Sequence, residues 1–174
     1  MELERKAARA EGRVRLEGGC AVSGYASFFG EVDTGGDVVE AGAFCDALAR
    51  AAAEGRRIKM LWQHDPAKVI GVWDEVREDA RGLFVKGRLL RDVALGAEAA
   101  ALVEAGALDG LSIGYTVKRA TRDAAGRRRL HELELWEVSL VTFPMLRSAR
   151  VGAKAAAREL AGALNAARAE MAGL

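Results

Sequence analysis

Two long β-prone stretches near the end of the chain constrain the fold more than any other feature of the sequence. Residues 111–122 and 128–142 are rich in leucine, isoleucine, valine, threonine and aromatic side chains, and residues 123–126 (DAAG) separate them. Two β-prone runs joined by a short segment that contains glycine are typical of a β-hairpin. Because a single hairpin is only marginally stable in water, we expect further strands to extend it into a sheet.

Shorter segments before this hairpin supply those strands and a few helices. The pattern predicts strands at residues 13–16, 21–26, 57–63, 69–76 and 82–90, and helices at residues 43–53 and 93–105. Residues 29–40 contain two aspartates and three glycines and predict a surface loop. Several strands linked mostly by hairpins indicate an α+β fold, and we expect a small, mostly antiparallel β-barrel surrounded by helices, with a sandwich as the alternative.

The 174 residues are enough for one folded domain with its own core. Residues 1–12 are polar, and we expect them to be disordered. The folded domain is predicted to span residues 13–152. Residues 153–174 form a predicted amphipathic helix, with Leu160, Leu164 and Ala167 on one face.

Composition excludes several classes of function. Lys and Arg total 26 against 25 Asp and Glu, and this balance argues against a nucleic-acid-binding protein. No apolar run reaches the length of a transmembrane helix, so we expect no membrane association. Cys20 and Cys45 are too few for a disulfide framework or a zinc site, and Glu31, Asp33 and Asp37 match no metal-binding pattern. We therefore expect no metal, no cofactor and a reducing cytoplasmic setting.

His64 is the first of only two histidines, and it follows an apolar predicted strand. A histidine at a strand end is fixed by the sheet and can still reach a cleft, as a general base must. A surface histidine fits the same pattern. His131 lies among arginines near the end of the predicted hairpin, where a solvated histidine is the better interpretation.

Ser112 lies in the sequence GLSIG, which matches the G-x-S-x-G motif of hydrolases. That motif requires a strand before the serine and a helix after it. Here a predicted helix comes before and a β-prone run follows, which disfavours an esterase of that type. Glycines on both sides would let a substrate backbone approach and leave amides open for an oxyanion. A serine in a tight turn is the alternative.

Glu137 interrupts an otherwise apolar predicted strand. Alternation places it on one face with Leu133, Leu135, Ser139 and Val141. A buried carboxylate needs a partner, and orienting a histidine in a Ser–His–acid triad would supply one. An ion pair with one of the many arginines explains the pattern equally well.

Four short motifs, in order and at comparable spacing, resemble the tailed-phage prohead protease family, which is distantly similar to the herpesvirus assemblin-type proteases. They are IKMLWQHD (58–65), IGVW (70–73), LDGLSIGY (108–115) and LWEVSLVTFP (135–144), and the resemblance covers about residues 20–150. Some members of this family belong to phage-derived particles such as gene transfer agents.

The resemblance implies a herpesvirus-protease-like barrel and a serine endopeptidase that acts in the cytoplasm, inside an immature capsid. It implies Ser112 as nucleophile, His64 as general base and Glu137 as the third member. Herpesvirus relatives use a second histidine there, which keeps His131 as an alternative. The relatives place an arginine near the oxyanion, for which Arg147 and Arg150 are candidates.

The resemblance also implies partners. The substrate would be the major capsid protein or its scaffold segment, with self-cleavage and self-association as further possibilities, and residues 154–174 would dock on scaffold. The alternative from another class of function is a non-catalytic assembly or scaffolding protein that keeps the fold. Convergence of Ser112, His64 and a carboxylate would favour the enzyme.

Overall fold

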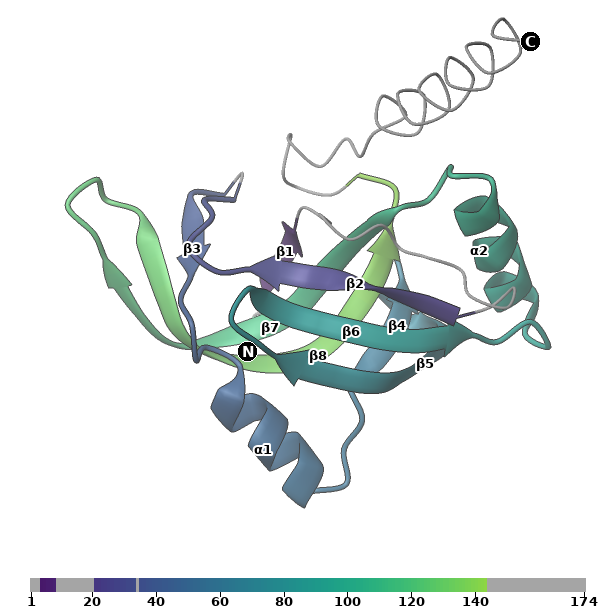
Figure 1. The fold of residues 1–174 in the computed structure, drawn as a ribbon, viewed down its shortest axis with the longest axis horizontal. Helices are drawn as coiled ribbons and strands as arrows, with labels where there is room; N and C mark the ends of the chain where they lie inside the picture. Colours follow the sequence, from purple (N-terminus) through teal and green to yellow (C-terminus); the bar gives the residue numbers. More distant parts are fainter. Residues whose placement is uncertain (1–3, 9–20, 34, 144–174) are drawn as a thin grey trace, which may run out of the picture.

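The computed structural model describes residues 4–8, 21–33 and 35–143. Along the chain these form the strands and helices β1 (Glu4–Ala8), β2 (Ala21–Phe28), β3 (Asp37–Val39), α1 (Cys45–Ala53), β4 (Lys59–Trp62), β5 (Asp65–Glu78), β6 (Gly82–Leu89), α2 (Ala94–Glu104), β7 (Gly110–Arg122) and β8 (Arg128–Val141) (Figure 1). The predicted strand at residues 13–16, the predicted C-terminal helix, Arg147 and Arg150 lie outside the described residues.

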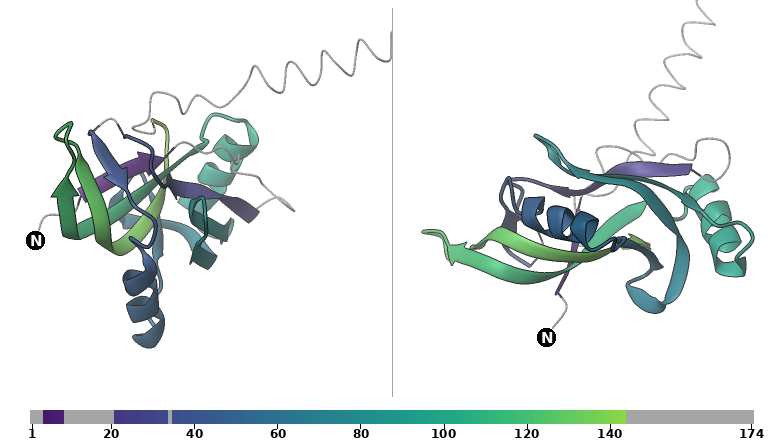
Figure 2. Two further views of the ribbon diagram at one scale, coloured as in Figure 1. Left: turned by 60° about the vertical axis from the view of Figure 1, so that its left-hand side comes forward. Right: turned by 90° about the horizontal axis from the view of Figure 1, so that it is seen from below.

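The strands form one mixed sheet in the order β1-β7-β8-β4-β5-β6-β2, with β3 pairing to β8. Most neighbours are antiparallel, but β3 and β4 both run parallel to β8. The sheet curls so that β2 approaches β7 without pairing to it in the described part of the chain (Figure 2). The architecture is therefore a half-barrel, where the sequence predicted a barrel.

Two helices flank this half-barrel in the described residues, so the expectation of a barrel surrounded by helices was wrong. Helix α1 packs against β5 and β8, and α2 packs against β5 and β6. Both match the predicted helices to within two residues. The core lies inside the curl of the sheet, and β7 contributes Leu111, Ile113 and Tyr115 to it.

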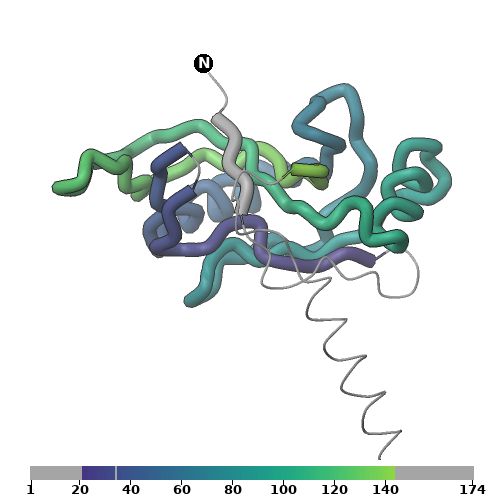
Figure 3. The backbone as a smooth tube through the Cα atoms, turned by 90° about the horizontal axis from the view of Figure 1, so that it is seen from above, coloured from purple at the N-terminus to yellow at the C-terminus, as the bar shows by residue number. Residues whose placement is uncertain are grey.

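The long hairpin is confirmed, and β7 and β8 pair from Gly110 opposite Val141 to Arg122 opposite Arg128 (Figure 3). Asp123 organises its turn, because the Asp123 carboxylate accepts hydrogen bonds from the backbone amides of Ala125 and Arg127. Together β7 and β8 form the longest ladder of the sheet, and the candidate site lies on that ladder.

Two segments differ from the sequence prediction because their partners are distant in the chain. Residues 4–8 were expected to be disordered, but they pair as β1 with β7, and Ala7 lies opposite Ser112. Residues 37–39 were expected in a loop, but they pair as β3 with β8. Each short segment gains its hydrogen-bond partners from a strand edge, which no local sequence pattern reveals.

The turn between β5 and β6 depends on the side chain of Asp79. Its carboxylate accepts hydrogen bonds from the backbone amides of Arg81 and Gly82, from the Tyr25 hydroxyl at 2.8 Å and from the Arg77 guanidinium at 2.6 Å. Burial by itself would raise the pKa of the Asp79 carboxyl, but these hydrogen bonds together lower it from 3.8 to about 2. The folded state therefore favours the ionised form of Asp79.

We predict that Asp79→Asn lowers the free energy of unfolding by about 1 kcal/mol at pH 7. Because the pKa of Asp79 is lower in the folded chain than in the unfolded chain, its stabilisation is complete above about pH 5 and declines as the pH falls toward 2. Denaturant titrations between pH 7 and pH 2 should show the difference between wild type and variant shrinking. Asp74→Asn, which removes an exposed ion pair with Arg88, is the control. A difference that is constant across this pH range would contradict the prediction.

Candidate active site

Strand β7 presents Ser112 on the face of the sheet opposite the core. Its neighbours Leu111 and Ile113 are fully buried in the core, so alternation along the strand turns Ser112 to the other face. Ser112 pairs with Ser139 of β8, and the Ser112 side chain is almost completely covered. The nucleophile candidate therefore lies on a rigid, doubly paired strand.

A β-bulge at Trp136 brings Glu137 to that same face. Gly114 pairs with Glu137 and Tyr115 with Leu135, so Trp136 is the extra residue on β8. Leu133 and Leu135 point into the core before the bulge, whereas Val138 and Leu140 do so after it. The prediction that Glu137 and Ser139 share a face with Leu135 was therefore wrong, because one inserted residue shifts the alternation.

A strained two-residue turn between β4 and β5 carries His64. Trp62 pairs with Asp65, and the two residues between them, Gln63 and His64, have φ values of 51° and 62°. Positive φ at both positions is the signature of a type I′ turn, which Asn-Gly sequences adopt most readily. Other residues in this conformation cost on the order of 1 kcal/mol each, and such strain is typical of functional sites.

Two backbone hydrogen bonds hold this turn on β8. The Gln63 amide donates to the Leu140 carbonyl at 3.0 Å, and the His64 amide donates to the Ser139 hydroxyl at 3.1 Å. The His64 imidazole is consequently fixed over the strand that carries Glu137 and beside the strand that carries Ser112.

Ser112, His64 and Glu137 form a continuous hydrogen-bonded chain. His64 Nε2 lies 2.6 Å from Ser112 Oγ, and His64 Nδ1 lies 2.6 Å from Glu137 Oε1. Glu137 is 3% exposed and cannot donate when ionised, so the neutral ring carries its proton on Nδ1 and accepts the serine proton at Nε2. This arrangement can deprotonate Ser112 during attack on a carbonyl carbon.

Ser139 is a site residue that we did not identify from the sequence. Its hydroxyl donates to Glu137 Oε2 at 2.6 Å and accepts from the His64 amide. One hydroxyl thus ties the acid to the turn that carries the base. Its place two residues after Glu137 in the LWEVSLV motif was the available signal, but the motif alone does not show the turn that it binds.

Gly114 makes room for the carboxylate. A Cβ atom at Gly114 would lie 2.0 Å from Glu137 Oε1, far inside any van der Waals contact. The sequence predicted that the glycines on both sides of Ser112 leave space for a substrate backbone. At Gly114 that space is occupied by the side chain of Glu137.

The structure separates the other candidates from this site. His131 Nε2 lies 2.8 Å from the Thr121 hydroxyl, on an exposed part of the hairpin. It contacts none of Ser112, His64 and Glu137 by any described hydrogen bond. Cys45 is exposed at the start of α1. No group of three or more potential metal ligands occurs among the described residues.

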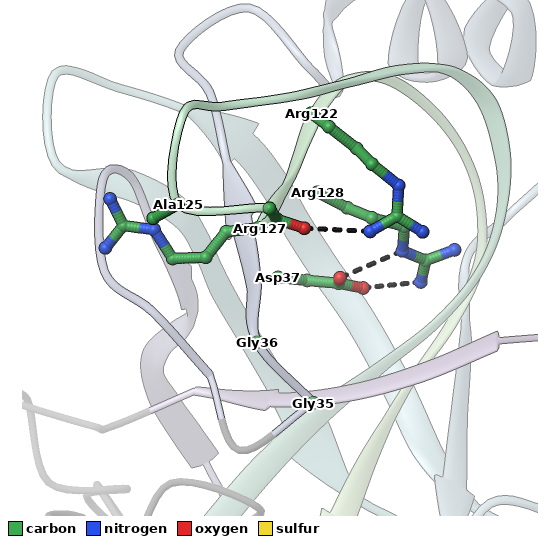
Figure 4. A pocket seen from close by; sticks show the side chains of 8 residues that line it. Gly35, Gly36, Asp37, Arg122, Ala125, Arg127 and Arg128 are labelled. Carbon is green, nitrogen blue, oxygen red and sulfur yellow. Dashed lines mark hydrogen bonds and ion pairs between the residues drawn. The ribbon is translucent and has the colours of Figure 1, made fainter.

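Two cavities in the described part of the chain border charged or reactive side chains. One, of about 380 Å³, adjoins the triad and is lined partly by His64 and Glu137. The other, of about 440 Å³, lies at the tip of the β7–β8 hairpin between Asp37, Arg122 and Arg128 (Figure 4). Arg128 pairs there with Asp37, and Arg122 donates to the Gly126 carbonyl, so these cations are already used by the fold.

Comparison with known proteins identifies the family. The sequence pattern of the caudovirus prohead serine proteases matches residues 7–163. The chain belongs to this family. It is 34% identical over 133 residues to the prohead protease of Enterobacteria phage HK97, an alignment that covers 75% of this chain and 58% of that protein. The chain thus spans under two thirds of the length of this relative. The resemblance drawn from the four motifs is confirmed.

A solved structure supports the fold. The bacteriophage T4 capsid assembly protease, gp21, superposes with a TM-score of 0.62, covering 82% of this chain and 98% of that one at 16% identity. At that identity the likeness concerns the fold alone. The further likeness to herpesvirus proteases stays a prediction.

We predict that Gly114→Ala disrupts the His64–Glu137 hydrogen bond while leaving the fold intact, because the added methyl group meets the carboxylate rather than the core. Proton NMR should detect the wild-type imidazole Nδ1 proton as a strongly downfield resonance. That resonance should be absent in Gly114→Ala and in Glu137→Gln, and present in Ser112→Ala. Its persistence in Gly114→Ala would show that the carboxylate tolerates the methyl group.

Proposed function

We propose that this chain is a serine endopeptidase that cleaves capsid or scaffold protein during maturation of a phage-like prohead. The observation that carries the proposal is the hydrogen-bonded chain Ser112–His64–Glu137, with 2.6 Å between donor and acceptor at each step. Membership of the prohead serine protease family supports the same activity.

In the proposed reaction, Ser112 Oγ attacks the carbonyl carbon of a peptide bond while His64 Nε2 takes the hydroxyl proton. The imidazolium then gives this proton to the nitrogen of the leaving amine, and the carbon–nitrogen bond breaks to leave an acyl-enzyme. Water, deprotonated by His64, releases the acid and regenerates Ser112. Glu137 holds the productive tautomer and stabilises the imidazolium, and Ser139 positions Glu137.

The substrate and setting follow from the family. We propose the major capsid protein or its scaffold segment as substrate, with self-cleavage as a further reaction, and the interior of the immature capsid as the place of action. Self-association and docking of residues 154–174 on scaffold remain part of this proposal. Among the described residues, no helix has the length and apolar character needed to cross a membrane.

The alternative is a non-catalytic assembly protein. A non-catalytic assembly role does not require a glycine opposite a buried carboxylate or a histidine in a strained turn next to it. The distance of 2.6 Å between Ser112 Oγ and His64 Nε2 supports the enzyme. An esterase of the G-x-S-x-G type is disfavoured, because Ser112 lies inside β7 with strand on both sides.

Co-expression with the capsid protein of the same phage or particle tests the proposal. We expect the capsid protein to be shortened by the wild-type chain and to stay intact with Ser112→Ala. Ser23→Ala, which removes a hydroxyl from β2, is the matched control and should process normally. Equal processing by wild type and Ser112→Ala, measured by mass spectrometry, would refute the protease assignment.

We predict that Glu137→Gln lowers kcat by about 10³ to 10⁴-fold, because the amide can donate to His64 Nδ1 and so favours the wrong tautomer. Peptide hydrolysis measured at saturating substrate checks this value, with circular dichroism to verify folding. An unchanged kcat would remove Glu137 from the mechanism and leave Ser112 and His64 in place.

Ser139→Ala should have a smaller effect, about tenfold on kcat with little change in KM, because it removes one hydrogen bond to Glu137 and one to the turn. The same hydrolysis assay separates kcat from KM. A rise in KM with unchanged kcat would place Ser139 in substrate binding instead of positioning.

A further inference from the structure

The cavity of about 380 Å³ beside the triad has walls that are mostly carbon. Leu61, Pro66 and Trp136 contribute apolar side chains, and His64 and Glu137 close it on the side of the triad. A concave, largely apolar space next to reactive groups is the usual form of a binding pocket. No part of the proposed proton transfers uses it.

The wall formed by Trp136 is fixed in place. The Arg56 guanidinium lies 4.8 Å from the centre of the Trp136 ring and donates to Glu134 at 2.6 Å and to the Leu135 carbonyl at 3.0 Å. Arg50 donates to the other oxygen of Glu134 at 2.7 Å. Both guanidinium groups are therefore occupied, and the cavity is formed before any ligand enters.

Arg57 and Lys59 line the same cavity and, unlike Arg56, have no side-chain partner among the described residues. Both residues are exposed, and neither forms an ion pair or a side-chain hydrogen bond with any described residue. Two unpaired cations beside an apolar cavity complement a ligand that has an apolar side chain and a nearby carboxylate.

The cavity lies within reach of a peptide bound for cleavage. His64 lines the cavity and lies 2.6 Å from Ser112 Oγ through its Nε2 atom, whereas Ser112 itself is not among the lining residues. One side chain, that of His64, thus lies between the nucleophile and the cavity. An extended peptide advances about 3.3 Å per residue. A side chain in the cavity would thus belong to a residue about two positions from the scissile bond.

We infer that this cavity is a substrate subsite that accepts an apolar side chain, and that Arg57 and Lys59 bind an acidic residue next to it in the substrate. The inference rests on the proposed protease function, which it extends to the class of peptide that is cleaved. Recognition and catalysis then share two side chains, those of His64 and Glu137.

Cleavage of a random peptide library by the full chain, with products identified by mass spectrometry, tests the inference. We expect an apolar residue at one position about two residues from the cleaved bond, with Asp or Glu adjacent. The double variant Arg57→Glu, Lys59→Glu should lower kcat/KM for such peptides about five- to tenfold and favour Lys or Arg at the acidic position. Lys86→Glu, at an exposed position of β6 and outside the lining of this cavity, is the charge-reversal control and should keep the wild-type preference.

Filling the cavity tests its apolar part separately. Leu61→Trp should exclude large apolar side chains at that one position and leave the acidic preference in place. If Ser112-dependent cleavage occurs with no such preference, or with a preference that neither variant changes, the subsite is refuted and the protease function stands. If wild type and Ser112→Ala release the same products, the proposed function fails. Binding of the library to Ser112→Ala then decides the subsite, which is overturned if acidic, apolar-containing peptides are not enriched.

Discussion

The other residues of this site are arranged around the buried carboxylate of Glu137. A charge that is 3% exposed is tolerated only when donors replace the water it has lost, and two are present, His64 Nδ1 and the Ser139 hydroxyl. Space is needed as well, and Gly114 supplies it. Removing a donor or filling that space would leave a buried charge without compensation. Glu137, His64 and Gly114 therefore form one interdependent unit.

This unit depends on strand β8, which lies between β7 and β4. Antiparallel pairing places Ser112 beside Ser139, and parallel pairing places the end of β4 beside Ser139 and Leu140. The turn that follows β4 is strained at Gln63 and His64, and hydrogen bonds to Ser139 and Leu140 offset part of that strain. The position of His64 is consequently set by a strand that lies about 75 residues later in the chain.

Local patterns predicted the long hairpin, both helices and strands at β5 and β6, because each depends on residues close in sequence. Ser112, His64 and Glu137 were singled out as candidates, and the structure brings them together. The parallel β4–β8 pairing, β1 and β3 depend on distant partners and were missed. The bulge at Trp136 was missed because an extra residue leaves the segment as β-prone as before, although it reverses which side chains face the core. Ser139, which lies after the bulge, was missed with it.

The bulge also explains how the hydrogen-bonded triad and the apolar cavity can lie side by side. Without the extra residue, Trp136 and Glu137 would point to opposite faces of β8, and the aromatic wall of the cavity could not adjoin the acid. With it, both side chains border one cavity. Arg57 and Lys59, which lie before and at the start of β4, contact neither Ser112 nor Glu137 by any described hydrogen bond or ion pair. The charge at the cavity can therefore be changed while the hydrogen bonds of the triad stay the same.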